Sequence, residues 1–526
     1  MEEYDVIVIG AGHNGLTVAG YLAKAGLNVC VLERAGFIGG EAITRELTVP
    51  GFKHDRSSSI HGLIHANPLL LNDELGLLSK HGLKYIFPDS NMSYIFPDET
   101  SMVSYPDLDK TCQQIAQFSE KDADTYRSFC EESKPMLDML VAGMFNPPPP
   151  LGEFYAQLDR SPEGQQILRH LFMSGYDIVN KLFEHEKTKI AMLKFMSEPM
   201  VAPEDKGTAF YLYAAIPLSH YFPHGIPIGG SGMLSEALGS AIKTYGGVIK
   251  VASEVKKITV KGGRAASVIL ASGEEISARR AIVANLDPRL VFPHMISETD
   301  KGFAARIAEI QDPGFSAILQ HMALNEAPKW KAGEHIGKSI SIEPLCWLEN
   351  LRRLFDDLRY GLIPSPENLA PCIFCTTVLD PTRAPAGKHT LYLWHYMPYF
   401  LKDGGPRKWD EIKTQVADMV LDKMRLHTTN MGPENIIART TYSPIDYERM
   451  NPNVVNGSIL GPGSYLHQFF SHRPIPELGQ YRTPVEGLYM SGQSFHPGGS
   501  ITGGGRATVQ VIMADLKIDF SNVIKQ

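Results

Sequence analysis

The chain has 526 residues and a mass of 58.1 kDa, and its 43% of hydrophobic and 21% of charged residues are typical of a globular protein rather than of a disordered chain. The 50 lysines and arginines against 58 aspartates and glutamates give a net charge of −8 without a basic block, which disfavours a nucleic-acid partner. No apolar run reaches the roughly 18 residues of a membrane span, so we expect membrane contact to be at most peripheral.

The six cysteines are too few for a disulfide scaffold in a chain of this length. Cys372 and Cys375 form a lone CxxC in an apolar run, which we interpret as two core thiols, and we expect no metal site. The first predicted strand begins at about Tyr4, which leaves no room for a cleaved leader. We therefore expect a reducing compartment, most simply the cytoplasm.

The N-terminal segment predicts a βαβ unit. Residues 5–9 are a short, β-branched apolar run typical of a buried parallel strand, and residues 28–32 predict a second such strand. Between them, apolar residues at helical spacing predict a helix that ends near Gly26. Glu33 stands at the end of the second strand, where an acid accepts hydrogen bonds from ribose hydroxyls.

Three glycines between the first strand and the helix complete a dinucleotide-binding fingerprint. Gly10 permits a tight turn, Gly12 lets the backbone approach a pyrophosphate, and Gly15 lets the helix pack close to the strand. The helix N-terminus offers free N–H groups and the positive end of its dipole to the phosphates. Strand, glycines, helix, strand and acid follow one another in the order that dinucleotide binding requires.

Two further stretches are rich in glycine. In the middle of the chain, residues 228–232 precede a predicted helix, and a β-meander follows that ends with the strand 281–285. Near the C-terminus a strand ends at Gly492, and a glycine-rich loop then leads into a helix that begins near Gly503. Such a loop lets backbone lie flat against a planar ring, and the helix N-terminus stabilises negative charge on that ring.

These motifs together resemble the FAD-binding amine-oxidase and phytoene-desaturase superfamily, and they are closer to its phytoene-dehydrogenase-related branch than to the carotenoid enzymes themselves. The resemblance is carried by Gly39-Gly40 after Glu33, by the His496-Pro-Gly-Gly block, and by the stretches at 380–389, 472–476 and 481–484. It implies an α/β fold, with a Rossmann-like FAD-binding domain of the glutathione-reductase-like flavoprotein type and an interleaved α+β substrate domain.

The resemblance also implies which residues bind FAD. Val255 pairs its backbone with adenine in the resembling flavoproteins, and the stretch at Asn285 returns the chain to the dinucleotide. The superfamily often has a basic residue after the glycine pair, whereas this chain has Glu41, which leaves Arg34 or Arg45 as the candidate cation. The expected cofactor-binding residues are Gly10, Gly12, His13, Asn14, Gly15, Glu33, Arg34, Gly39, Gly40, Ser57, Ser58, Val255, Asn285, Gly492, Gln493, Ser500, Ile501 and Thr502.

We expect a discontinuous FAD-binding domain made of residues 1–65, 225–290 and 480–526. Residues 66–224 and 291–479 then form the substrate-binding domain, the first part mainly helical and the second a mixed sheet. In the first part, methionines and aromatic residues between 192 and 222 suit either a pocket for a large apolar substrate or ordinary core. In the second, we predict strands at 316–323 and 390–396 and an amphipathic helix at 409–426.

The expected reaction transfers a hydride from a hydrophobic or aromatic small molecule to N5 of FAD, in a desaturase, dehydrogenase or oxidase. Oxygen or a quinone is the expected electron acceptor. His496, beside the glycine loop, is the candidate catalytic acid or base; the alternative is that it only hydrogen-bonds backbone to shape the loop.

Three alternatives stay open. The first is a redox-neutral, flavin-dependent isomerase of a polyene, and the second is an amine or alcohol oxidase. The third is a flavin-free binding or chaperone module on the same fold, against which the intact glycine fingerprint with Glu33 argues. The sequence leaves the substrate unidentified, and it is compatible with a homo-oligomer.

Overall fold

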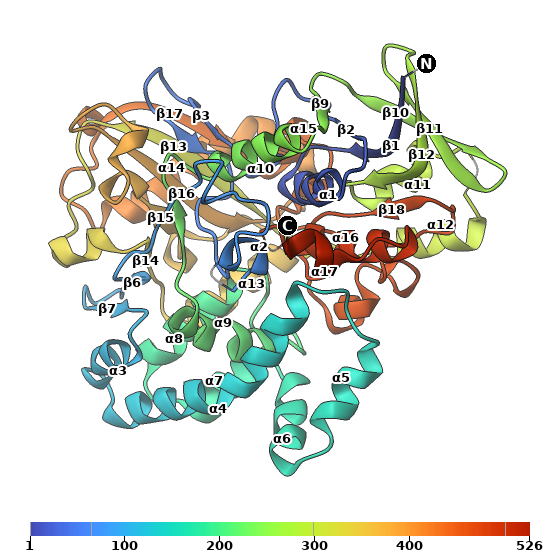
Figure 1. Cartoon of the computed structure of the whole chain (residues 1–526). Coiled ribbons are helices and arrows are strands. Elements are labelled where there is room, and N and C mark those ends of the chain that lie inside the picture. The colour runs from blue at the N-terminus through green and yellow to red at the C-terminus, as the bar shows by residue number, and fades with distance from the viewer. Residues whose placement is uncertain (1, 65, 298, 500, 526) are drawn as a thin grey trace.

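The fold is given by a computed structural model, which describes residues 2–64, 66–297, 299–499 and 501–525 (Figure 1). Over these residues the longer strands form two seven-stranded sheets. The first sheet has β1 at its centre, in the order β10-β11-β12-β1-β2-β9, and β18 pairs with β12. Its strands are β1 (Glu2–Ile9), β2 (Val29–Leu32), β9 (Val248–Lys250), β10 (Val255–Lys261), β11 (Arg264–Leu270), β12 (Glu275–Ala284) and β18 (Leu488–Met490).

The central strands of the first sheet are parallel and buried. β1 runs parallel to β2 on one side and to β12 on the other, and β18 runs parallel to β12. The residues Val6 to Ile9 of β1 are all buried, as a strand covered on both faces requires. The carboxyl ends of β1, β2 and β12 therefore meet at one edge of the sheet, where ligands bind in open α/β sheets.

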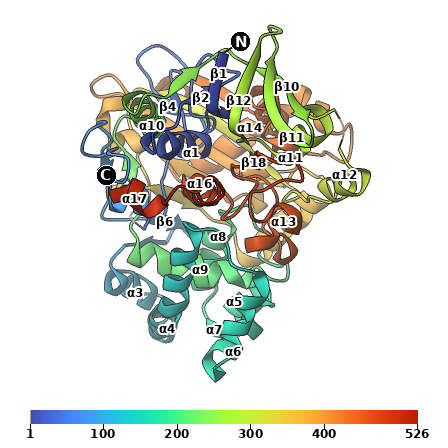
Figure 2. The ribbon, with the colours of Figure 1, turned by 45° about the vertical axis from the view of Figure 1, so that its right-hand side comes forward.

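Three helices from distant parts of the chain pack together over this sheet. They are α1 (His13–Lys24), α10 (Gly232–Thr244) and α16 (Gly503–Asp515), and α1 lies between the other two in both views (Figure 2). All three bury apolar residues in one core with β1 and β2. The predicted βαβ unit, the helix after residue 232 and the helix that begins at Gly503 are thereby confirmed.

The second sheet has the order β17-β13-β16-β15-β14-β6-β7. Its strands are β6 (Met92–Ile95), β7 (Ser101–Ser104), β13 (Ser316–Leu324), β14 (Ser341–Pro344), β15 (Cys372–Phe374), β16 (His389–Met397) and β17 (Ile436–Tyr442). On one face, Leu391 and Leu393 of β16 pack in a core with α14 (Trp409–Arg425). On the other face, Trp394 and Tyr396 pack against helices of the 66–224 segment. The strands predicted at 316–323 and 390–396 and the helix at 409–426 are confirmed.

The segment 66–224 forms the helical end of the molecule, at the bottom of both views (Figure 2). Its helices include α3 (Leu108–Ala116), α4 (Glu120–Met144), α5 (Leu151–Leu158), α6 (Pro162–Leu171), α7 (Gly175–Leu182), α8 (Glu186–Ser197) and α9 (Ala209–Tyr221). The segment, expected to be mainly helical, also contributes β6 and β7 to the second sheet. These two short strands join the sheet through β14, which lies much later in the chain, a partner that local sequence does not reveal.

The remaining helices and strands belong to neither of the two large sheets. They are α2 (Pro68–Leu71), α11 (Pro288–His294), α12 (Lys301–Ala308), α13 (Leu348–Arg359), α15 (Pro444–Met450), α17 (Phe520–Lys525), β3 (Thr44–Arg45), β4 (His54–Asp55), β5 (Tyr85–Ile86) and β8 (Ile226–Pro227). The described part of the chain also forms ten short 3-10 helices. None of the helices in the described residues is both long and apolar enough to cross a membrane. All six cysteines are buried and free, and burial raises the pKa of Cys375 to about 12.

A buried ion-pair network joins the segment around β4 to the segment after β15. The Arg383 guanidinium donates from Nε to Asp380 Oδ2 at 2.9 Å, pairs through Nη1 with Asp55, and donates from Nη2 to the Pro227 carbonyl at 2.9 Å. The side chains of Arg383, Asp55 and Asp380 are each 1% exposed. The network therefore fixes the chain just before Arg56, on which the candidate site depends.

Several histidines are buried as neutral imidazoles, and four of them illustrate the effect. His54, His61, His395 and His496 are at most 3% exposed. Burial lowers the pKa of His54 and His496 to about 4 and that of His61 and His395 to about 3, from the usual 6.5. Between pH 6.5 and these lowered values, the unfolded chain binds protons that the folded chain does not.

We expect the protein to be acid-labile for this reason. Below pH 6.5 each of these histidines lowers the free energy of unfolding by about 1 kcal/mol per pH unit, so the free energy of unfolding falls steeply as the pH drops toward 5. Melting temperatures measured between about pH 7.5 and 5 test this. The variant His61→Gln should flatten the slope, whereas His467→Gln, at an exposed position, should not. A melting temperature that stays constant over this range would contradict the expectation.

Candidate functional site

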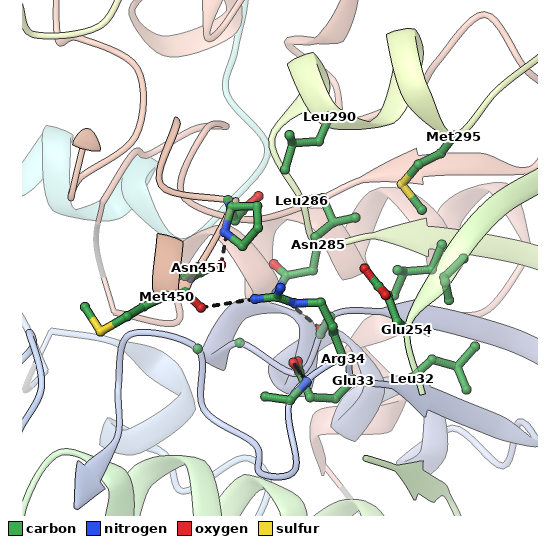
Figure 3. Close-up of a pocket in the computed structure, with 18 of the residues that line it drawn as sticks. Leu32, Glu33, Arg34, Glu254, Asn285, Leu286, Leu290, Met295, Met450 and Asn451 are labelled. Carbon is green, nitrogen blue, oxygen red and sulfur yellow. Dashed lines mark hydrogen bonds between the residues drawn. The ribbon is translucent and has the colours of Figure 1, made fainter. Parts of the chain in front are cut away.

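A cavity of about 330 Å³ lies where β1, β2 and β12 end (Figure 3). The glycine loop forms one wall with Gly10 and Gly12, and Glu33 and Arg34 extend from the end of β2. Asn285, which follows β12, lies opposite them. The cavity thus occupies the edge of the sheet at which the βαβ unit is expected to bind a dinucleotide.

The backbone of the glycine loop is packed so closely that added side chains would clash with neighbouring atoms. Gly10 has φ +91°, in the left-handed region that favours glycine. A Cβ on Gly15 would lie well inside van der Waals distance of the Gly10 carbonyl, and a Cβ on Gly40 would lie 3.0 Å from Gly12 Cα. Gly39 donates its N–H to the Ala11 carbonyl at 2.8 Å, which holds the glycine pair against the loop. The loop and the pair therefore form one backbone cradle beside the cavity.

Glu33 is held rigidly at the cavity by the backbone. Its Oε2 accepts a hydrogen bond from the Ala11 N–H at 2.7 Å, and its Oε1 accepts one from the Ala35 N–H at 2.8 Å. Each carboxylate oxygen keeps a further lone pair for a ligand. Glu33 thus lines the cavity with both of its carboxylate oxygens held by backbone N–H groups.

Asn285 carries a polar atom that lacks a partner. Its Nδ2 donates to the Gly10 carbonyl at 3.3 Å, and its Oδ1 is buried with no hydrogen-bond donor in the described part of the chain. A buried acceptor without a donor costs about 1–3 kcal/mol. Together with the glycine cradle and Glu33, this open acceptor fits a bound dinucleotide.

Apolar side chains line one end of the cavity, where Glu254 also lies. Leu286, Leu290 and Met295 line it, beside Val255 at the start of β10 (Figure 3). These side chains suit a flat heterocycle such as adenine. The cavity is closed on another side by residues 450–453, and Arg34 Nη2 donates across it to the Met450 carbonyl at 3.0 Å.

The N-termini of α1 and α16 are joined by side chains from the predicted set. His13 Nδ1 accepts the Thr502 N–H at 3.1 Å, and Asn14 Oδ1 accepts the Gly505 N–H at 2.9 Å. Asn67 Nδ2 donates to Thr502 Oγ1 at 2.6 Å. Two helix N-termini, each the positive end of a dipole, therefore lie side by side next to the glycine loop.

His496 makes a structural contact. It is 3% exposed, and its Nε2 hydrogen-bonds the Gly143 carbonyl at 3.1 Å at the end of α4. Burial lowers its pKa to about 4, so the imidazole is neutral near pH 7. The contact supports the alternative in which His496 shapes the loop, while its catalytic role remains a prediction.

The predicted cofactor residues divide into two groups. Gly10, Gly12, Glu33, Arg34, Gly40, Val255 and Asn285 line the cavity. His13, Asn14, Gly15, Gly39, Ser57, Ser58, Gly492, Gln493, Ile501 and Thr502 are not among its lining residues. Ser500 lies outside the described residues.

Of the two candidate cations, only Arg34 lines the cavity. Arg45 is not among the lining residues, but its guanidinium stacks 4.3 Å above the ring of Phe37, which does line the cavity, so its role remains a prediction. Arg56 does line the cavity, although the predicted cofactor set omits it. The set also omits residues 450–453, which carry no local signal because they reach the cavity from a distant part of the chain.

An aromatic face of the second sheet contacts the segment that follows Arg56. Tyr392 of β16 donates its hydroxyl to the Ser57 carbonyl at 2.8 Å, and Phe374 of β15 packs against the Tyr392 ring. Further aromatic contacts join α9 to the segment before β18, with the Phe210 and Phe469 rings 4.7 Å apart.

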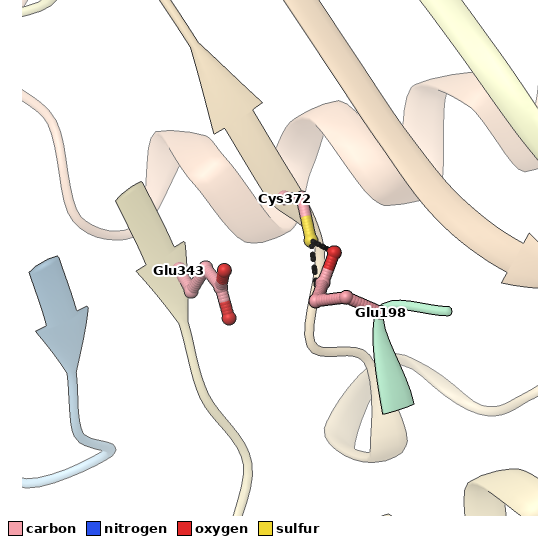
Figure 4. Close-up of side chains that lie close together, drawn as sticks. All are labelled: Glu198, Glu343 and Cys372. Atoms are coloured by element: carbon pink, nitrogen blue, oxygen red, sulfur yellow. Dashed lines mark hydrogen bonds between the residues drawn. The ribbon is translucent and has the colours of Figure 1, made fainter. Parts of the chain in front are cut away.

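An ionic cluster is buried on this face of the sheet (Figure 4). Lys194 pairs with Glu198 and lies 3.0 Å from Cys372 Sγ and 3.3 Å from Glu343 Oε2. Burial raises the pKa of Glu343 to about 7, although Lys194 opposes this rise. Donor atoms of Glu198, Glu343 and Cys372 lie within 4.8 Å of one another, and the Lys194 ammonium already places a positive charge among them.

One family model matches the N-terminal part of the chain, and several known proteins are similar to it over nearly its whole length. Residues 8–71 match the NAD(P)-binding Rossmann-like domain. Pyridine nucleotide-disulfide oxidoreductase domain-containing protein 2 of Mus musculus is 30% identical over 98% of this chain and 94% of its own. One of the subunits of limonene dehydrogenase from Castellaniella defragrans is 27% identical, covering 99% of this chain and 96% of its own.

Proteins of lower sequence identity also align with nearly the whole chain. Phytoene desaturase of Pseudescherichia vulneris is 22% identical, covering 97% of this chain and 99% of its own. Among solved structures, a triple mutant of putrescine oxidase has a TM-score of 0.62 at 13% identity, covering 98% of this chain and 99% of that one. That likeness shows a shared fold, in agreement with the two-sheet architecture described above.

Proposed function

The chain belongs to the phytoene-dehydrogenase-related family of oxidoreductases, and from that premise we propose that it binds FAD and oxidises a hydrophobic or aromatic small molecule. The observation that carries the proposal is the cavity at the edge of the first sheet, where a glycine cradle, Glu33 and the open acceptor of Asn285 converge. Bound FAD would accept a hydride from the substrate.

The cavity and the neighbouring N-terminus of α16 each suit one part of the cofactor. Glu33 would accept hydrogen bonds from the adenosine ribose, and the residues around Val255 would hold adenine. The glycine cradle at the N-terminus of α1 would bind the diphosphate. The N-terminus of α16, tied to α1 through His13 and Thr502, would stabilise negative charge on the flavin ring.

The aromatic side chains on the second sheet would orient the substrate and exclude water from it. Tyr392 and Phe374 belong to the aromatic face that is tied to Ser57, next to the glycine pair and Glu41. The transfer of an apolar substrate from water to such a surface is favourable. The exclusion of water also strengthens the electrostatic interactions of the site. The names of the limonene dehydrogenase and phytoene desaturase relatives agree with an apolar substrate.

The absorption spectrum of the purified protein tests the proposal. We expect the visible bands of an oxidised flavin, release of FAD into the supernatant on heating, and bleaching by anaerobic photoreduction. A colourless protein that fails to take up added FAD would contradict the proposal and favour a flavin-free binding module.

Reoxidation of the bleached protein separates the remaining alternatives. Rapid recovery of the spectrum with oxygen is expected of an oxidase. Slow recovery with oxygen but rapid recovery with a quinone is expected of a dehydrogenase or desaturase. Anaerobic turnover of a polyene without net electron transfer would identify an isomerase.

A further inference from the structure

The glycine pair is followed by an acid at the place where a dinucleotide would bring negative charge. Glu41 comes directly after Gly39-Gly40, and Gly40 lies against Gly12 of the phosphate-binding loop. A diphosphate placed there would be repelled by Glu41 unless a cation lay between them. The structure places such a cation next to Glu41, although it comes from a different segment of the chain.

That cation is Arg56. Its Nη2 donates to the Gly40 carbonyl at 2.7 Å and to Glu41 Oε1 at 2.9 Å. The side chain is 10% exposed, and Arg56 is among the residues that line the cavity. Its guanidinium is therefore fixed at the glycine end of the cavity, whereas Arg34 is tied to Met450 on another side.

Glu41 is itself held in place by three donors. Besides Arg56, Ser57 Oγ donates to Glu41 Oε2 at 2.6 Å, and Asn451 Nδ2 donates to Glu41 Oε1 at 2.8 Å. Asn451 comes from the segment beyond α15 and lines the cavity as well. The carboxylate is thus anchored from two sides of the cavity, and it fixes the direction of the guanidinium.

Arg56 keeps a donor free for a ligand. Its Nε is buried and has no acceptor among residues 2–64, 66–297, 299–499 and 501–525. A guanidinium carries five N–H donors in a planar fork that matches the geometry of phosphate oxygens. A buried N–H without an acceptor is rare in proteins, and a phosphate that draws the guanidinium toward the cavity would give it one.

We propose that Arg56 is the side chain that binds the diphosphate of the dinucleotide, with Glu41 as the residue that positions it. The inference rests on the proposed function, because it assumes that the cavity takes FAD. It accounts for an acid after the glycine pair, since the Glu41–Arg56 pair as a whole presents the guanidinium, rather than the carboxylate, to the cavity.

Binding of ADP and adenosine to the FAD-free, full-length chain tests this proposal by titration calorimetry. The two ligands differ only in the diphosphate. We expect Arg56→Ala to weaken ADP binding roughly 10–100-fold, as loss of a charge-assisted hydrogen bond does, and to change adenosine binding less than about 2-fold. Arg56→Lys, which keeps the charge but not the fork, should give an intermediate loss for ADP.

The controls separate this role from a merely structural one. Arg482→Ala, an exposed arginine that pairs with Asp515 and does not line the cavity, should bind both ligands like the unmodified chain. Glu41→Gln should weaken ADP more than adenosine, because the guanidinium loses its anchor. Equal losses for ADP and adenosine in Arg56→Ala and Arg56→Lys, or unchanged ADP binding, would overturn the proposal. If the unmodified chain bound neither ADP nor FAD, the proposed function itself would fail.

Discussion

Replacement of Arg383 by methionine is expected to lower the free energy of unfolding by about 3–5 kcal/mol, the range measured when one partner of a buried ion pair is removed. Methionine is of similar length, so the change leaves little empty volume. It does leave the carboxylates of Asp55 and Asp380 buried without their cation. The loss should appear in urea unfolding curves as a lower midpoint with an unchanged slope.

Two controls show whether the buried charge causes the loss. Arg482→Met removes an exposed arginine that pairs with Asp515 through two hydrogen bonds, and should cost less than about 1 kcal/mol. Adding Asp55→Asn to Arg383→Met removes one uncompensated charge and should restore part of the stability. A loss below about 1 kcal/mol in Arg383→Met would contradict the expectation.

The ion-pair network of Arg383 also gives a structural role to the stretch at 380–389, for which the sequence alone indicates none. The stretch at 380–389 is noticed only because it resembles a family pattern, since its residues carry no periodicity or spacing of their own. In the structure, Asp380 and Arg383 lie on one short turn and fasten Asp55 of β4. Arg56 follows Asp55 directly, so a structural motif far along the chain holds a residue of the candidate site.

The N-terminal unit is predictable from sequence because its parts are local. The strand, the glycine loop, the helix and Glu33 follow one another within 33 residues, and each has a composition that its geometry requires. The meander and the helix after Gly503 are predictable for the same reason.

The rest of the site depends on contacts between distant segments. Asn451 reaches the cavity from beyond α15, and Arg56 is oriented by Gly40 and Glu41, which precede it by 16 and 15 residues. β6 joins the second sheet through β14. No local pattern marks such pairings, because they depend on how the two sheets pack and not on the propensity of any one segment.

Replacement of Gly15 by alanine is expected to weaken FAD binding by more than about 100-fold and to lower the free energy of unfolding by about 1–3 kcal/mol, as overpacking does. A Cβ there would clash with the Gly10 carbonyl and lie 2.9 Å from Asn285 Nδ2. Both are atoms of the cradle, and the Gly10 carbonyl is backbone that cannot turn aside. The clash therefore separates α1 from β1, or displaces the glycine loop from the cavity. Equilibrium dialysis with FAD and thermal unfolding measure the two effects.

The matched control is Gly36→Ala, a glycine three residues beyond Glu33 whose Cβ would meet nothing within 4 Å and whose φ lies outside the left-handed region. It should keep both FAD affinity and stability within experimental error, because an exposed glycine has room for a methyl group. Equal losses in the two variants would mean that the segment tolerates no change of any kind. Normal FAD binding in Gly15→Ala would mean that the cofactor does not lie on the glycine loop, since the loop cannot accept that Cβ and keep its shape.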